Sequence, residues 1–135
     1  MGNERIEMNK SIIETKKGPQ PKGQYSQIVV GGPFVFLSGQ LPFAPDGKLV
    51  DGDIQVQTKQ ILKNIKNMLE EAGSSLAKAV RMGVYIIDID DFQAMNEVYI
   101  EFFPEQPPAR TTLVVSTFPP SVNLTACGFF LTGLT

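Results

Sequence analysis

Val80-Arg81-Met82-Gly83-Val84-Tyr85-Ile86-Ile87 is a predicted β-strand with apolar side chains on both of its faces. The even-numbered positions from Val80 to Ile86 occupy one face, and Tyr85 and Ile87 lie on the other. A strand of this kind is normally buried on both sides of its sheet. Two faces must therefore be covered, and one layer of helices covers only one of them.

Amphipathic helices are predicted before and after this strand. The first follows Asp53, which can cap a helix, and ends near Ala72, with Gly73 where a left-handed residue ends many helices. The second follows Asp91, another candidate cap, and ends before Pro104. Apolar residues recur at helical spacing in both: Ile54, Ile61, Ile65, Met68, Leu69 and Ala72, then Phe92, Met95, Val98, Tyr99 and Phe102.

The remaining apolar stretches predict further strands at 25–30, 34–40, 111–115 and 123–131, with a short one near 12–14. Gly31-Gly32-Pro33 is a turn signal that joins the first two into a hairpin. The chain is therefore expected to form one α+β domain over residues 1–135, a mixed sheet with two helices on one face. The other, apolar face is left without a helix and indicates a partner subunit.

Charge and composition exclude several classes of function. The 14 acidic and 12 basic residues are interspersed, the net charge is −2, and no basic block suggests nucleic-acid binding. The small cluster Lys16, Lys17 and Lys22 is broken by glycine and proline and is interpreted as a solvated loop. With no histidine, the chain cannot form a serine–histidine triad, a cysteine–histidine pair or a usual zinc site, so no metal is expected.

The sole cysteine, Cys127, is expected to be a buried, inert thiol, because no nearby base would lower its pKa. No disulfide can form within the chain, which fits a reducing compartment. No apolar segment of signal-peptide type follows Met1, and no run approaches the ~20 apolar residues of a membrane span. The expectation is a cytoplasmic protein without a membrane partner.

A candidate binding residue stands in Pro107-Pro108-Ala109-Arg110-Thr111-Thr112. The prolines restrict the backbone and bar a helix, and an apolar strand-like run follows. An arginine presented in this way offers a planar fork of donors that suits a carboxylate or a phosphate. The alternative is an arginine at the start of a strand that simply points to solvent.

An ordered series of motifs resembles the Rid family of reactive intermediate deaminases, also called the YjgF family and formerly the L-PSP endoribonucleases. The resemblance runs from about Ile12 to about Phe130. The segments that carry it are Gln24-Tyr25-Ser26-Gln27, Phe36-Leu37-Ser38-Gly39-Gln40-Leu41-Pro42, Gly52-Asp53-Ile54 with Gln57-Thr58, Ala72-Gly73-Ser74-Ser75-Leu76, Asp91-Phe92 with Met95-Asn96-Glu97-Val98-Tyr99, Phe102-Phe103 and Pro108-Ala109-Arg110.

The resemblance implies a chorismate-mutase-like fold and a homotrimer in which three sheets pack into a central barrel, with ligand clefts between subunits. It also implies hydrolysis of 2-imino acids, such as 2-iminobutanoate and 2-iminopropanoate, to 2-oxo acids and ammonia, with no metal and no cofactor. The barrel would cover the sheet face that lacks a helix.

Individual functional positions of the family match residues of this chain. Its carboxylate-binding arginine matches Arg110, and a residue whose main chain contacts the ligand matches Thr112. The cleft tyrosine matches Tyr25, and the helix asparagine matches Asn96.

The Ser-Gly pair of the second strand matches Ser38 and Gly39, where glycine would allow close approach of the backbone to a ligand. Each position also has an ordinary interpretation. Tyr25 can be a strand aromatic, Ser38 and Gly39 can mark a strand bend, and Asn96 can bond to a neighbouring backbone group.

One position departs from the family pattern. The deaminases carry a glutamate on the last strand that helps to place the attacking water, and this position falls on Thr125. Threonine can hydrogen-bond a water but cannot act as a base at neutral pH. No acidic residue lies between Arg110 and Thr135, so a shifted alignment does not restore one.

Three functions remain open from the sequence. The first is imine hydrolysis with Arg110 and Thr125 as the candidate catalytic residues, weakened by the missing glutamate. The second is a protein of the same fold that binds a small carboxylate without chemistry. The third is the ribonuclease of the older family name, which the lack of histidine and of a basic patch disfavours.

Overall fold

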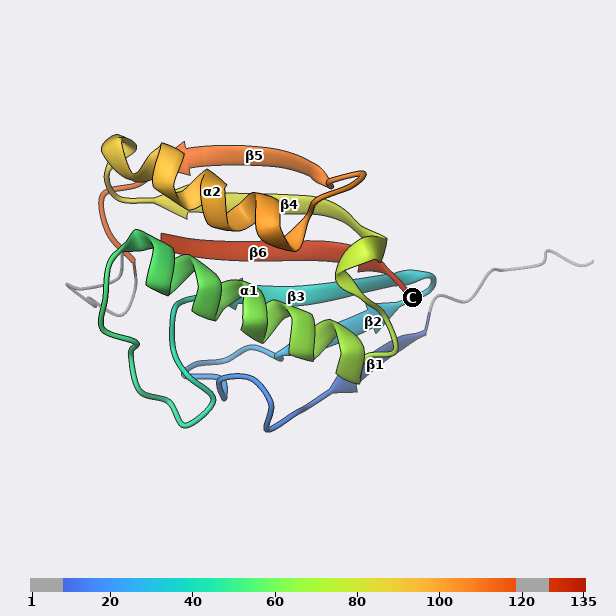
Figure 1. The fold of residues 1–135 in the computed structure, drawn as a ribbon. Coiled ribbons are helices and arrows are strands. Elements are labelled where there is room, and N and C mark those ends of the chain that lie inside the picture. The colour runs from blue at the N-terminus through green and yellow to red at the C-terminus, as the bar shows by residue number, and fades with distance from the viewer. Residues whose placement is uncertain (1–8, 119–126) are drawn as a thin grey trace, which may run out of the picture.

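The computed structural model describes residues 9–118 and 127–135. One six-stranded sheet carries two helices on the same face (Figure 1). The strands are β1 (Lys10–Ile13), β2 (Ile28–Gly31), β3 (Phe34–Gln40), β4 (Ala79–Ile86), β5 (Ala109–Val114) and β6 (Cys127–Leu134). The helices are α1 (Ile54–Glu71) and α2 (Phe92–Phe102), with short 3₁₀ turns η1 (Leu76–Lys78) and η2 (Ile89–Asp91). The α+β architecture and the order of elements predicted from the sequence are confirmed.

The sheet order is β1-β2-β3-β6-β4-β5. All neighbouring strands are antiparallel except β4 and β5, which run parallel because α2 carries the chain back between them. This crossover places β5 at an edge of the sheet with α2 in front of it (Figure 1). Any side chain of β5 on the helix side therefore lies close to α2.

The core lies between the helices and one face of the sheet. It joins the predicted apolar faces of α1 and α2 to alternate positions of β3 and β4. Buried members are Val35, Leu37, Ile61, Ile65, Met68, Leu69, Met82, Val84, Ile86, Met95, Val98 and Tyr99. Gln57, Thr58 and Asn64 of α1 are also buried, which apolar spacing does not reveal.

The strand boundaries correct the sequence prediction at several points. β2 begins at Ile28 rather than residue 25, so Tyr25 lies in the preceding loop. In β4, a register shift between Ala79 and Arg81 turns Ala79 into the core and leaves Val80 39% exposed. The predicted alternation therefore holds only from Met82 onward. β6 ends at Leu134 rather than residue 131, and residues 123–126 of that predicted strand lie outside the described residues.

The helix ends follow the sequence closely. Asp53 caps α1 by accepting a hydrogen bond from the backbone N–H of Val56 at 3.0 Å, as its residue type predicts. Gly73, just beyond the helix, has φ +79°, a conformation that glycine adopts without strain. Asp91 stands at the N-cap of α2, but its side chain makes no capping bond, so that prediction was wrong in its chemistry.

Candidate functional site

Arg110 lies on β5, on the side of the sheet that faces the helices. Its register partner on β4 is the fully buried Met82, which shares that side. The guanidinium Nη1 donates to the side-chain oxygen of Asn96 on α2 at 2.7 Å. Its central carbon is 4.7 Å from the ring centroid of Tyr99. Arg110 is thus partly buried and held against α2, and it does not simply point to solvent.

A cavity of about 360 Å³ opens beside Arg110. We call it the Arg110 cavity; it is lined by Asn96, Tyr99, Ile100, Phe103, Pro107, Pro108 and Arg110. The loop that forms one wall contains Gln106 in a left-handed conformation, φ +45°, directly before Pro107. Strained backbone of this kind is found most often at functional sites, and here it leads the chain into the strand that carries the arginine.

The electrostatics of this cavity favour an anion. Burial raises the pKa of the Tyr99 phenol, and the nearby Arg110 opposes that rise, so Tyr99 stays neutral at ordinary pH. Within residues 9–118 and 127–135, the ion pairs are Lys17–Glu71 and Lys66–Glu70, and no carboxylate pairs with Arg110. The arginine therefore has N–H groups left for an acidic ligand.

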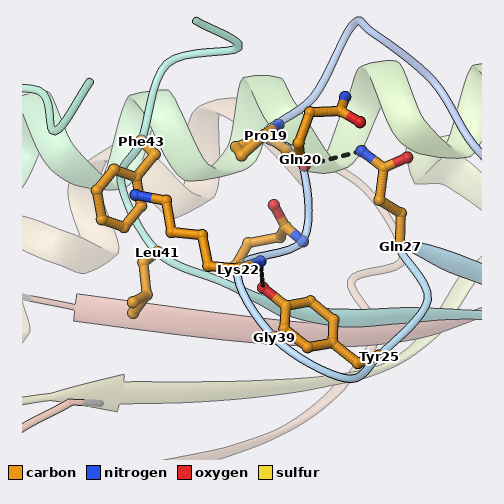
Figure 2. Close-up of a pocket in the computed structure, with 9 residues that line it drawn as sticks. Pro19, Gln20, Lys22, Tyr25, Gln27, Gly39, Leu41 and Phe43 are labelled. Carbon is orange, nitrogen blue, oxygen red and sulfur yellow. Dashed lines mark hydrogen bonds between the residues drawn. The ribbon is translucent and has the colours of Figure 1, made fainter. Parts of the chain in front are cut away.

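Tyr25 and Gly39 line a second cavity, of about 350 Å³ (Figure 2). The Tyr25 side chain is 49% exposed, and its hydroxyl accepts the backbone N–H of Lys22 at 3.0 Å. Lys22, Leu41 and Phe43 complete the walls together with Pro19, Gln20, Gln27 and Gln40. We call this space the Lys22 cavity.

Ser38 is not part of the lining of the Lys22 cavity. Its hydroxyl donates to the carbonyl oxygen of Ser26, and its N–H donates to the carbonyl oxygen of Gln27 at 3.0 Å. The pairing of β3 with β6 shifts register between Leu37 and Gln40. Ser38 thus joins the loop before β2 to β3 at a strand irregularity, while the neighbouring Gly39 reaches the cavity.

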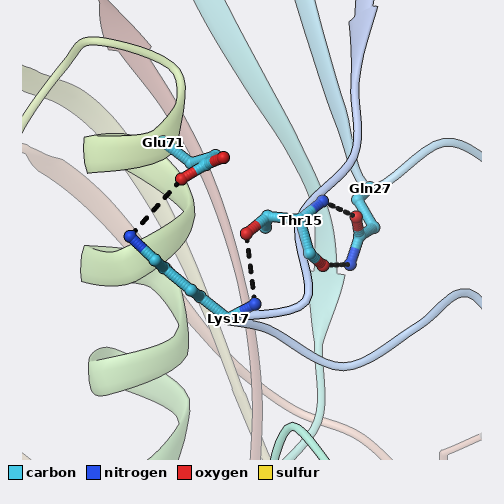
Figure 3. Close-up of polar contacts among 4 residues, drawn as sticks. All are labelled: Thr15, Lys17, Gln27 and Glu71. Atoms are coloured by element: carbon cyan, nitrogen blue, oxygen red, sulfur yellow. Dashed lines mark hydrogen bonds and ion pairs between the residues drawn. The ribbon is translucent and has the colours of Figure 1, made fainter.

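One buried side chain organises the loop that carries Lys22 and Tyr25 (Figure 3). The amide of Gln27 accepts from the N–H of Thr15 at 2.8 Å and donates to the carbonyl of Thr15 at 3.0 Å and to that of Pro19 at 2.8 Å. Lys17 pairs with Glu71 at 3.6 Å, an exposed contact that stabilises little. Gln27 therefore closes the loop.

The sequence predicts a solvated loop for Lys16, Lys17 and Lys22, and all three residues are exposed in the structure. The interpretation suits Lys17, whose side chain is 70% exposed. Lys22 also places its ammonium group 3.5 Å from the ring centroid of Phe43 and lines a cavity, which the sequence did not indicate. No sequence signal distinguishes the two lysines, because the difference depends on how Gln27 folds the loop.

The two cavities lie on separated strands. Gly39 is on β3 and Arg110 is on β5, with β6 and β4 between them. Three interstrand spacings amount to about 14 Å, which is too far for one small acid to contact both within a subunit. Thr112 is partly buried on β5, opposite Val84 and on the same side of the strand as Arg110. Thr125 lies outside the described residues.

Among the residues that the structure describes, no group of three or more His, Cys, Asp or Glu side chains could hold a metal ion. In the same part of the chain, no helix is long and apolar enough to cross a membrane.

Comparison with known proteins identifies the family. The family model described as Endoribonuclease L-PSP matches residues 15–124. A RutC family protein of Pyrococcus abyssi is 49% identical over 116 residues, which cover 85% of this chain and 91% of that protein. The mitochondrial protein MMF1 of Saccharomyces cerevisiae is 38% identical over 112 residues, covering 83% of this chain and 77% of that protein.

Solved structures agree with this sequence similarity. The Rid family protein YyfA of Yersinia pestis superimposes with a TM-score of 0.88 at 36% identity, covering 94% of this chain and all of that one. TdcF of E. coli, solved with bound serine, gives a TM-score of 0.85 at 33% identity, covering 93% and 98% of the two chains. On the sequence match and the shared fold together, this chain belongs to the Rid family, also known as the YjgF or L-PSP family.

Proposed function

We propose that this protein binds small 2-imino and 2-oxo acids through Arg110 and hydrolyses the imines to 2-oxo acids and ammonia. The observation that carries the proposal is the Arg110 guanidinium, which Asn96 holds at 2.7 Å beside a cavity and which has no carboxylate partner among the described residues. A planar fork fixed at one nitrogen suits a bidentate pair with a ligand carboxylate. TdcF, a relative of the same fold, has been solved with bound serine. Serine carries a carboxylate on the carbon that bears its nitrogen.

The reaction requires an oriented substrate and one water molecule. Binding of the carboxylate would hold the neighbouring iminium carbon in place, which lowers the entropic part of the barrier. Water adds to that carbon, the C–N bond breaks, and the products are the 2-oxo acid and an ammonium ion. No redox step and no electron acceptor is required.

We further propose that the site is completed between subunits of a homotrimer. The family resemblance implies such clefts, and the distance of about 14 Å between β3 and β5 in one subunit supports them. The sheet face opposite the helices also exposes large apolar side chains, with Ile12 47%, Phe36 45% and Leu113 50% exposed. Large exposed apolar faces of this kind are normally covered by a partner.

A non-catalytic binding protein is the second candidate. It is favoured by Thr125 at the family's glutamate position and by the absence of acidic residues between Arg110 and Thr135. In addition, neither cavity is lined by a carboxylate that could act as a base among the described residues. The protein would then bind or sequester the acid without changing it.

An ammonia-release assay with freshly generated 2-iminopropanoate and 2-iminobutanoate separates the two candidates. Imine hydrolysis predicts ammonia release above the spontaneous rate, and loss of that excess when Arg110 is replaced. Binding of 2-oxobutanoate without any increase in ammonia release would support the binding protein and refute the enzyme.

A further inference from the structure

The walls of the Lys22 cavity present donors and one positive charge. Lys22 is the only charged residue among those that line the cavity, and none of them is acidic. The whole chain carries a net charge of −2, with 14 acidic residues, so a cavity without acids does not follow from the composition. The cavity is therefore suited to a negatively charged group.

Lys22 is an exposed residue, and its ammonium group rests against an aromatic ring at the mouth of the cavity. It lies 3.5 Å from the ring centroid of Phe43, where the π electrons attract a cation (Figure 2). The ring itself is fixed, because Phe43 is 8% exposed and its carbonyl accepts from the side-chain nitrogen of the buried Asn64 at 2.7 Å. An aromatic ring does not neutralise the charge, so the ammonium can still pair with an anion.

Tyr25 offers a second donor in the same cavity. Its oxygen accepts the N–H of Lys22 at 3.0 Å, and the hydroxyl hydrogen then remains for another acceptor. The amide of Gln27, by contrast, is engaged by Thr15 and Pro19. The ammonium of Lys22 and the hydroxyl of Tyr25 can therefore both meet a ligand, and both suit a carboxylate.

We propose that Lys22 determines substrate specificity by binding the second carboxylate of a dicarboxylic 2-oxo or 2-imino acid. This inference rests on the proposed function, in which Arg110 of a neighbouring subunit binds the first carboxylate. The Lys22 cavity contributes one cation and the Arg110 cavity another, and neither is lined by an acidic residue among those described. The preferred ligand then carries one anionic group at each end.

Calorimetric titration with two acids of equal chain length tests this specificity. 2-Oxoglutarate has a distal carboxylate, and 2-oxopentanoate has a methyl group in its place. We expect the unmodified protein to bind 2-oxoglutarate about ten-fold more tightly, near the lower end of the range for a hydrogen bond to a charged group. Lys22→Met should abolish this preference and change the affinity for 2-oxopentanoate by no more than about two-fold, because methionine can still pack on Phe43.

Lys17→Met is the matched control, since Lys17 belongs to the same loop but pairs with Glu71. It should leave the preference intact. Equal affinities in the unmodified protein, or a preference that survives Lys22→Met, would overturn the role of Lys22 while leaving the proposed function standing. If neither acid binds, or if Arg110→Lys weakens neither, the proposed function fails and this inference fails with it.

Discussion

At the scale of the residue, Arg110 combines three features of a carboxylate anchor. It is partly buried on an edge strand, it donates to Asn96, and its guanidinium lies over the ring of Tyr99. The contact with the Tyr99 ring and the hydrogen bond to Asn96 restrict the guanidinium before a ligand arrives, so less conformational entropy is lost on binding.

Replacement of Arg110 by lysine keeps the charge but removes the planar fork. We expect Arg110→Lys to weaken binding of 2-oxobutanoate by about 1.5–3 kcal/mol, the range for a hydrogen bond to a charged group. Unchanged calorimetric affinity in Arg110→Lys would show that this arginine has no part in binding.

Thr125 tests the catalytic half of the proposal. If the missing glutamate limits the rate, Thr125→Glu should increase imine-dependent ammonia release at least ~10-fold, a modest share of a usual general-base contribution. Arg110→Ala in the same variant should remove the gain, because the water would then meet an unheld substrate. A folded variant that binds 2-oxobutanoate but shows no increase would mean that hydrolysis is limited elsewhere.

At the scale of the element, the loop before β2 depends on Gln27. Its side chain is 2% exposed and makes three hydrogen bonds to the main chain of Thr15 and Pro19. Gln27→Ala leaves those buried groups without partners, and we expect the free energy of unfolding to fall by about 1–3 kcal/mol. Because the same loop carries Tyr25, ligand affinity should fall as well.

Gln24→Ala is the matched control, since Gln24 is an exposed glutamine of the same loop. It should change neither denaturant unfolding nor affinity. Equal stability of the Gln27 and Gln24 variants would mean that the loop is organised by other contacts.

The start of α2 predicts a dependence of stability on pH. Partial burial raises the pKa of Asp91, and the nearby Asp88, Asp90 and Asp53 raise it further. The folded state thus holds the proton more strongly than the unfolded state. Asp91 therefore contributes its full stability at pH below the ordinary carboxyl pKa. This contribution is lost as the pH rises through the raised pKa of Asp91 in the folded protein.

The Asp91→Asn variant should therefore be as stable as the original protein at acidic pH and more stable than it at neutral pH. The gain should be of the size of an exposed charge interaction, up to about 1 kcal/mol. Thermal unfolding of both proteins between acidic and neutral pH measures it. A variant that is less stable at neutral pH would indicate that the carboxylate instead stabilises the helix N-terminus.

The sequence predicts elements best where several local rules agree. Apolar spacing, Asp53 and Gly73 predict α1 almost to the residue, because propensity, capping and burial agree there. The prediction fails at Val80, where a register shift in β4 breaks the alternation. Such a shift arises from pairing with β6, which is distant in the sequence.

The candidate site was predictable only in part. Family motifs pointed to Arg110 and Asn96, and the structure brings these two together. Lys22 and Phe43 meet because a hydrogen-bonded loop folds over a buried residue, and neither motif nor periodicity indicates such a contact. The distance between the two cavities follows from the sheet order, which local patterns do not determine.

At the scale of the whole molecule, the sheet has one face that its own helices do not cover. A cross-strand row on that face runs through Ile12, Val29 and Phe36 by register, and Leu113 lies opposite Tyr85. Three of these five side chains are more than two-fifths exposed, namely Ile12, Phe36 and Leu113. In the proposed trimer this face packs against other copies, and sedimentation equilibrium should show trimers at micromolar concentration.

Mixing two inactive variants tests most directly whether the site lies between subunits. Arg110→Ala removes the group that binds the carboxylate. Tyr25→Asp puts a carboxylate, which repels that of the ligand, in the other half of the site. Neither variant alone should therefore bind 2-oxobutanoate tightly. When the two are unfolded together and refolded into mixed trimers, random assembly should pair an intact Arg110 with an intact Tyr25 in about a quarter of the clefts of a head-to-tail ring. Calorimetry should then recover about that fraction of tight sites, whereas mixed trimers that recover none would contradict a site shared between subunits.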